Sequence, residues 1–278
     1  MRRLIVRPGA IGDFILSLPA LEHLRTGYTE VWAASLNLPL ARFADKTRSI
    51  ASTGLDLVGL PEVEPPRRLL EELGAFDSIV SWYGANRREF RQAVESLGLP
   101  FRFLQAVPRE GLPLHAADFY LEQVSGGAGA VPRLPCPPGE GRFAAIHPFS
   151  GSPKKNWPLE RYKELSRLLE QRLPVKWIVE RGSWSPDGVD VEPPIDDLYD
   201  LACYLAKARF YVGNDSGVTH LAAAAGTPVV ALFGPTDPSV WAPRGPGVHV
   251  ISTLRVGEPM TSIALEEVLA AVRGMCPG

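Results

Sequence analysis

Residues 211–238 read YVGNDSGVTHLAAAAGTPVVALFGPTDP, and this stretch decides the fold class. A short apolar strand is predicted at 210–212, turn residues follow at 213–215, and Ser216 can cap a helix that Gly226 then ends. The apolar run at 228–233 is typical of a strand that is buried on both faces of a parallel sheet. Strand, helix and strand in this order make a βαβ unit. Its helix begins at the carboxyl end of a strand, where open α/β sheets bind anionic ligands.

The same alternation of strands and helices runs through the rest of the chain and predicts doubly wound parallel sheets. The pattern is weaker at 49–60, where it fits a strand or a pair of strands. Residues 126–141 are dense in glycine and proline and lack periodicity, so an interdomain linker is expected there. We predict an α/β protein of two Rossmann-like domains facing across a cleft, one within 1–130 and one within 142–262. A last helix within 263–278 is expected to be free to pack back on the first domain.

The composition excludes several classes of protein. The 278 residues include 45% hydrophobic and 22% charged residues with a net charge of −2, which gives no electrostatic basis for binding nucleic acid. Three cysteines, Cys136, Cys203 and Cys276, form no C-x-x-C pair, so reduced thiols are expected rather than disulfides or a zinc site. No apolar run long enough to span a bilayer and no signal peptide is recognisable, so a cytoplasmic protein is expected.

The first candidate loop follows the first predicted strand at 8–13. Gly9 and Gly12 allow a ligand to approach the backbone closely, and Asp13 at the start of a helix can act as a general base. An ordinary carboxylate that the helix dipole stabilises is the alternative interpretation of Asp13.

The second candidate loop, HPFSGSPKKNWP at 147–158, combines the residues that a diphosphate needs. Ser150, Ser152, Lys154 and Lys155 provide hydroxyl groups and ammonium groups next to a glycine, although the Walker A pattern is absent. A solvated turn with two lysines is the alternative.

The third candidate loop lies in the opening stretch. Asp215, Ser216, Gly217 and His220 fall within about one helical turn. The alternative is a helix cap followed by a histidine of the core. No His-x-x-x-His or Asp-x-Asp cluster accompanies these residues, so no metal site is expected.

Three blocks, in their order and spacing, resemble the family 9 glycosyltransferases, the ADP-heptose:lipopolysaccharide heptosyltransferases. They are RPGAIGDFILSLPALEHLR (7–25), HPFSGSPKKNWPLERYKEL (147–165) and the opening stretch. The resemblance implies a GT-B fold with the acceptor on the N-terminal domain and the nucleotide sugar on the C-terminal domain. It also implies inverting, metal-independent transfer of a sugar, heptose favoured, from a nucleotide-diphosphate donor, ADP-heptose favoured. The implied acceptor is the lipopolysaccharide core or another glycan, which can be lipid-linked.

The resemblance also implies roles for individual residues. Asp13 matches the catalytic base, Lys155 matches the lysine on the donor phosphates, and Ser150 matches a hydroxyl beside it. The D-[ST]-G-x-x-H element around the diphosphate and the sugar corresponds to Asp215, Ser216, Gly217 and His220. These roles agree with the chemistry. The acceptor hydroxyl needs a base, and the leaving diphosphate needs positive charge and N–H donors when no metal is present.

One departure keeps other functions open. The family's G-x-x-x-E element, which carries a glutamate to the nucleotide ribose, is missing from KWIVERG at 176–182, and Glu180 is the candidate replacement. Because the second domain is short, a non-catalytic nucleotide-sugar-binding protein of the same fold is the alternative. An NAD-dependent oxidoreductase is disfavoured because G-x-G-x-x-G is absent from both domains. A basic face with Arg87, Arg88 and Arg91 leaves open a peripheral contact with the cytoplasmic face of the inner membrane, although such faces are usually just solvated.

Overall fold

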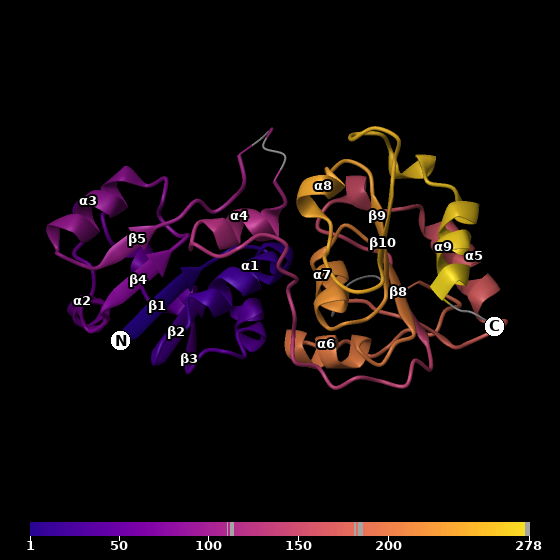
Figure 1. Cartoon of the computed structure of the whole chain (residues 1–278), viewed down its shortest axis with the longest axis horizontal. Coiled ribbons are helices and arrows are strands. Elements are labelled where there is room, and N and C mark those ends of the chain that lie inside the picture. Colours follow the sequence, from indigo (N-terminus) through magenta and orange to yellow (C-terminus); the bar gives the residue numbers. More distant parts are fainter. Residues whose placement is uncertain (110, 112–113, 181, 183–185, 276–278) are drawn as a thin grey trace. The chain divides into compact units, whose positions relative to one another are not determined.

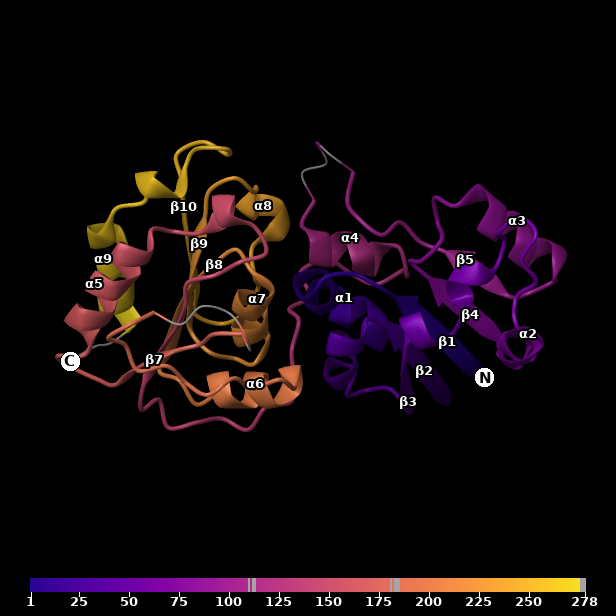
Figure 2. The same ribbon diagram turned by 180° about the vertical axis from the view of Figure 1, so that it is seen from behind.

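The computed structural model describes residues 1–109, 111, 114–180, 182 and 186–275, and the chain divides into two compact units, Met1–Ala130 and Val131–Gly278 (Figure 1). Each unit contains a five-stranded sheet in which every paired strand is parallel to its neighbour. Helices cover both faces of each sheet (Figures 1 and 2). The prediction of two doubly wound parallel α/β units is therefore confirmed.

In the first unit the strand order is β3-β2-β1-β4-β5, and the strand order reverses between β1 and β4. Helices α1 and α4 pack together on one face, while α2 and α3 cover the other (Figure 1). The strands are β1 (Arg2–Arg7), β2 (Tyr28–Ala33), β3 (Lys46–Ser49), β4 (Ser78–Ser81) and β5 (Phe101–Phe103). The helices are α1 (Ile11–His23), α2 (Arg67–Gly74), α3 (Arg88–Ser96) and α4 (Ala116–Glu122), with 3₁₀ helices η1 (Ser35–Leu40), η2 (Ile50–Ser52) and η3 (Leu55–Leu57).

In the second unit the strand order is β10-β9-β8-β6-β7, and the switch point lies between β6 and β8. Helix α6 packs with α7, and α5 packs with α9 (Figure 2). The strands are β6 (Ala144–His147), β7 (Val175–Trp177), β8 (Phe210–Asn214), β9 (Val229–Phe233) and β10 (Val248–Ser252). The helices are α5 (Leu159–Leu169), α6 (Leu198–Leu205), α7 (Gly217–Ala224), α8 (Pro238–Trp241) and α9 (Leu265–Met275), with 3₁₀ helices η4 (Pro153–Lys155) and η5 (Met260–Ser262).

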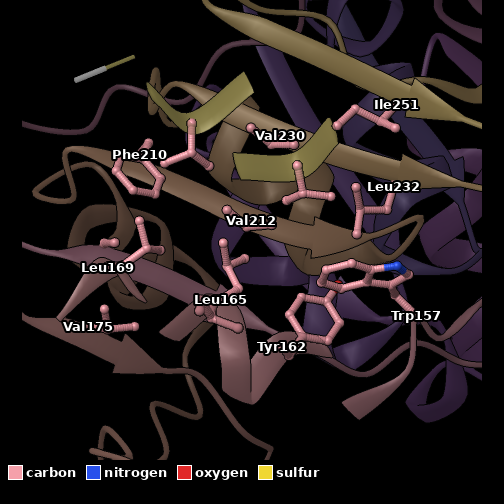
Figure 3. Close-up of a cluster of buried hydrophobic side chains, with 14 of the residues drawn as sticks. Trp157, Tyr162, Leu165, Leu169, Val175, Phe210, Val212, Val230, Leu232 and Ile251 are labelled. Atoms are coloured by element: carbon pink, nitrogen blue, oxygen red, sulfur yellow. The ribbon is translucent and has the colours of Figure 1, made fainter. Parts of the chain in front are cut away.

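An aromatic core holds α5 and α9 against the second sheet (Figure 3). Trp157 and Tyr162 meet edge to face, with 4.9 Å between their ring centroids, beneath the apolar side chains of β6, β8 and β9. The indole N–H of Trp157 donates to the carbonyl of Ile263 (3.0 Å), which ties the start of α5 to the segment before α9. This core therefore fixes the loop that precedes α5.

The final helix, α9, packs within the second unit. Val268 and Val272 of α9 are buried in the core of the second unit, where α9 lies against α5, β9 and β10. The reason is hydrophobic burial. The apolar stripe of α9 completes the face of the sheet that α5 covers only in part.

Three segments depart from the predicted elements. Within 49–60, residues 50–52 and 55–57 form η2 and η3 rather than strands, because Leu55 and Val58 are spaced for one face of a 3₁₀ turn and both are buried. Gly213 and Asn214 belong to β8 rather than to a turn, since they pair with His147 and Leu232 of the neighbouring strands. Strand β10 was not predicted. It is a sheet-edge strand of mostly half-buried and exposed residues, which leaves a weak pattern.

Candidate functional site

Three loops meet at the carboxyl edge of the second sheet. They follow β6, β8 and β9, which are adjacent strands, so residues from 148–158, 215–216 and 234–237 are brought together. The first two loops flank the switch point of the sheet, where α/β folds bind ligands.

Asn214 joins two of these loops. Its side chain is fully buried, its Oδ1 accepts from the Trp157 backbone N–H and the Tyr162 hydroxyl (both 2.9 Å), and its Nδ2 donates to the carbonyl of Pro148 (2.7 Å). An amide of this kind supplies a donor and an acceptor in fixed directions. Asn214 therefore sets the position of the loop that carries Lys155 relative to the start of α7. From the sequence, Asn214 was expected only as a turn residue.

The centre of the site is the carboxylate of Asp215. Its Oδ2 accepts from Lys155 Nζ and from Thr236 Oγ1, both at 2.6 Å, and its Oδ1 lies 3.9 Å from Nε2 of His220. The side chain of Asp215 is 9% exposed and that of Lys155 is 29% exposed. The ammonium group is therefore fixed at one point while part of it stays accessible to a ligand.

Helix α7 supplies the remaining polar groups of this site. Ser216 is the N-cap, and its Oγ accepts from the backbone N–H of Thr219 (3.4 Å). The N–H groups of Gly217 and Val218, which open the first turn, precede the first acceptors of the helix and lie at its positive dipole end. An ammonium group and free N–H groups at a helix N-terminus are the kinds of donor that bind phosphate in proteins.

The remaining predicted residues of the second unit differ in their contacts and exposure. Ser150 Oγ contacts Ser152 O (2.8 Å) and Asn156 Oδ1 (2.7 Å), so it holds the loop in shape. Ser152 precedes η4, and Lys154 is exposed. Glu180 is exposed and lies beyond the end of β7, the strand next to β6. No described contact joins it to Asp215, so its contact with a ribose stays a prediction.

Thr236 was missed, although the predicted βαβ unit includes it. A threonine in a Gly-Pro-Thr-Asp-Pro loop resembles ordinary turn chemistry. Its role appears only because β9 lies beside β8, which brings its hydroxyl group to Asp215.

His147 was also missed. The last residue of β6 is 2% exposed, and neither ring nitrogen has a hydrogen-bond partner among the residues that the structure describes. Burial lowers the pKa of His147 to about 4, so the imidazole is neutral at physiological pH. Its ring meets that of Phe149 edge to face.

A second group of residues lies at the carboxyl end of β1 in the first unit. Asp13 stands in the first turn of α1, and within the described part of the chain its carboxylate makes no hydrogen bond or ion pair. Gly9 adopts a φ of 130°, and a Cβ at that position would lie 3.5 Å from the Cβ of Asp13. Gly12 lies directly before Asp13 in the same turn. Asp13 is thus half-buried and still able to accept a proton or a hydrogen bond.

Two further features concern metal binding and membrane spanning. Among the described residues, no group of three or more His, Cys, Asp or Glu side chains is arranged to hold a metal ion. No helix in the described ranges has the length and apolar character needed to span a membrane. Cys276 lies outside the described residues.

Sequence comparison finds similarity to one family over part of the chain. Residues 185–262 match the model of glycosyltransferase family 9 (heptosyltransferase). Lipopolysaccharide heptosyltransferase 1 of Escherichia coli K12 is 33% identical over 114 residues, which are 37% of this chain and 35% of that protein. Part of the chain, residues 185–262, is thus similar to glycosyltransferase family 9. The alignment spans about a third of the length of this curated relative.

Solved structures support the fold of this chain. The E. coli heptosyltransferase WaaC with ADP superposes with a TM-score of 0.73 at 19% identity, covering 99% of this chain and 100% of that one. The same enzyme with ADP-2-deoxy-2-fluoro heptose gives a TM-score of 0.70, also at 19% identity, covering 99% and 100%. These likenesses support the GT-B fold that the sequence implied.

The matched family segment contains the residues of the Asp215 site. Asp215, Ser216, Gly217, His220 and Thr236 all lie within 185–262, whereas Lys155 and Asp13 lie outside it. Lys155 nevertheless reaches Asp215 across 60 residues of chain, so the fold adds the lysine to the family segment.

Proposed function

We propose that the protein is an inverting, metal-independent glycosyltransferase. It transfers a sugar, with heptose favoured, from a nucleotide-diphosphate donor, with ADP-heptose favoured. The acceptor is the lipopolysaccharide core or another glycan, which can be lipid-linked. A cytoplasmic location, with the acceptor presented at the inner membrane, belongs to the same proposal.

One observation carries the donor side of this proposal. The ammonium of Lys155 is held 2.6 Å from Asp215 Oδ2 at the N-terminus of α7. A fixed cation and the free N–H groups of a helix terminus are what a diphosphate needs when no metal ion neutralises it. Heptosyltransferase WaaC, which has the same fold, was solved with ADP and with an ADP-heptose analogue, which favours this class of donor.

The reaction assigns a separate task to each group of residues. The Asp13 carboxylate accepts the proton of the acceptor hydroxyl as the oxygen of that hydroxyl forms its bond to the anomeric carbon of the donor sugar. The bond between the anomeric carbon and the diphosphate oxygen breaks on the opposite side, which inverts the configuration. Lys155 and the first N–H groups of α7 stabilise the negative charge on the departing nucleoside diphosphate.

The test measures binding and transfer separately. Isothermal titration calorimetry should detect ADP and ADP-heptose, and an assay with a heptose-free lipopolysaccharide core acceptor should detect transfer. The Asp13→Asn variant should keep the donor affinity and lose transfer by roughly 10²- to 10⁴-fold. Activity should persist in EDTA, and the anomeric configuration of the product, read by NMR, should be opposite to that of the donor.

Three outcomes would overturn parts of the proposal. No binding of nucleotide or nucleotide sugar at millimolar concentration would remove the donor assignment. Donor binding without transfer to any glycan would favour the non-catalytic nucleotide-sugar-binding alternative. A requirement for a divalent metal would remove the metal-independent mechanism.

A further inference from the structure

A buried arginine lies directly behind Asp13. Arg7 is the last residue of β1, and it is only 2% exposed. Its guanidinium carbon lies 4.5 Å from the centroid of the Tyr120 ring and 5.7 Å from that of Trp82. The two rings thus hold the guanidinium in place beneath the loop at 8–13.

The hydrogen bonds of Arg7 are directed at this loop. Its Nη1 donates to the carbonyl of Pro8 (3.2 Å), its Nη2 donates to the carbonyl of Asp13 (3.1 Å), and its Nε donates to Ser17 Oγ (3.1 Å). Within the described part of the chain, Arg7 has no ion pair with a carboxylate. Burying a cation without an opposite charge in contact is costly, and carbonyl groups and aromatic faces offset that cost only in part. The arrangement is therefore a poor choice for stability alone.

The loop that Arg7 holds has little other support. Helix α1 begins after Ala10, an N-cap residue whose side chain cannot accept a hydrogen bond. The amide of Asn37 donates to the carbonyl of Gly9 (3.0 Å), so Arg7 and Asn37 together hold three of the loop's carbonyl groups. Without Arg7 the segment 8–13 would lose two of these three contacts.

The guanidinium and the Asp13 carboxylate both lie near Gly9. A Cβ on Gly9 would lie 3.6 Å from Arg7 Nη1 and 3.8 Å from Asp13 Oδ2. Both charged groups therefore border the space that Gly9 leaves open. Tyr120 lies within reach of both charges. Burial raises its pKa to about 12, the Arg7 charge opposes that rise, and the Asp13 charge adds to it. The Tyr120 hydroxyl stays protonated and donates to the carbonyl of Ala106 (3.2 Å).

We propose that Arg7 is the positioning residue for Asp13. Held between Tyr120 and Trp82, it fixes the conformation of 8–13 and thereby the place from which the Asp13 carboxylate accepts its proton. This inference rests on the proposed function. Arg7 acts through Asp13 and does not bind the donor, so its loss should lower kcat and leave the affinity for ADP unchanged.

The test compares Arg7→Met and Arg7→Lys with the wild-type protein. Thermal melting and ADP binding first establish that each variant is folded. Arg7→Met should lower kcat by roughly 100-fold, the loss that a misplacement of about 1 Å can cause. Arg7→Lys keeps the charge but lacks the planar guanidinium that donates two hydrogen bonds at once, so it should recover only part of the rate. Arg7→Lys serves as the main variant if Arg7→Met does not fold.

Arg3 provides a matched control. It lies on the same strand, and its Nη1 donates to the carbonyl of Leu24 (2.6 Å) at the opposite end of α1. Arg3→Met removes the same kind of contact away from Asp13, so it should lower the melting temperature and leave kcat unchanged. A double variant sharpens the result. If Arg7 acts through Asp13, adding Arg7→Lys to Asp13→Asn should cause no further loss of rate.

The outcomes separate this inference from the proposed function. Absence of transfer by the wild-type protein would overturn the proposed function and this inference with it. Wild-type transfer combined with an unchanged kcat in the folded Arg7 variants would overturn only the positioning role. The positioning role would also be overturned if Arg3→Met lowered kcat equally, if ADP affinity fell in parallel with kcat, or if the rate losses in the double variant multiplied.

Discussion

Lys155 Nζ lies 2.6 Å from Asp215 Oδ2, although 60 residues separate them in the chain. The contact joins the loop after β6 to the loop after β8, and Thr236 from the loop after β9 approaches the same carboxylate oxygen at the same distance. Three adjacent strands thus converge on one ion pair. Its aspartate is buried and its lysine is partly accessible.

Lys155→Ala should weaken ADP binding by about 10- to 100-fold, the loss expected when a charge-assisted hydrogen bond to a phosphate is removed. Isothermal titration calorimetry measures the effect. Lys163→Ala is the matched control, because Lys163 belongs to α5 in the same unit and pairs with Glu160 rather than with the site. Equal affinities of the Lys155→Ala and wild-type proteins for ADP would show that the lysine does not contact the phosphates.

Asn214→Ala should destabilise the protein by about 2–5 kcal/mol, because it leaves buried partners of three hydrogen bonds unsatisfied. Urea denaturation of the full-length protein, monitored by tryptophan fluorescence, measures this change. ADP affinity should fall as well, since the loop that carries Lys155 loses its attachment. Asn86→Ala, at an exposed position, should change stability little. A small effect of Asn214→Ala would mean that the loop at 148–158 is held by other contacts.

His147 should make stability depend on acidic pH. Burial lowers its pKa to about 4 from an ordinary 6.5, so between these values the unfolded chain binds a proton that the folded chain does not. The free energy of unfolding is therefore unaffected by the titration of His147 above pH 6.5. It falls by up to about 3 kcal/mol as the pH drops from 6.5 toward 4. His147→Leu should flatten the dependence of the unfolding free energy on pH within this window. His249→Gln, at an exposed histidine, should leave it unchanged, and a flat wild-type profile would contradict the prediction.

Cys136 should react slowly with alkylating reagents. Burial raises the pKa of its thiol to about 12, and the neighbouring Cys203 contributes to the rise. At pH 8 the reactive thiolate is then ~10³-fold rarer than for an ordinary cysteine. Peptide mass spectrometry after iodoacetamide treatment should show slow labelling that accelerates as the pH rises and in urea. Equal labelling rates in the folded and the urea-unfolded protein would show that the fold does not suppress the reactivity of Cys136.

Local patterns predicted much of the fold. The apolar run that became β9, the cap at Ser216 and the glycine at 226 that ends α7 were all identified, because each depends on neighbours within a few residues. The predictions were wrong where tertiary contacts override local preference. Gly213 and Asn214 are typical turn residues, yet pairing with the neighbouring strands makes them the end of β8. Strand β10 was also beyond local patterns.

The same distinction between local patterns and tertiary contacts applies to the candidate site. The sequence by itself determined the alternation of strands and helices, the glycine-containing loops at the ends of strands and the chemical types of Asp13, Lys155 and Asp215, because these depend on residue identity and short-range spacing. Only the tertiary structure decided that Lys155 rather than Lys154 reaches Asp215, that Thr236 shares this carboxylate and that Arg7 lies buried behind Asp13. The physical reason is the order of strands in the sheets. Strand order is set by the burial of whole faces rather than by neighbouring residues, and it alone determines which distant loops share an edge.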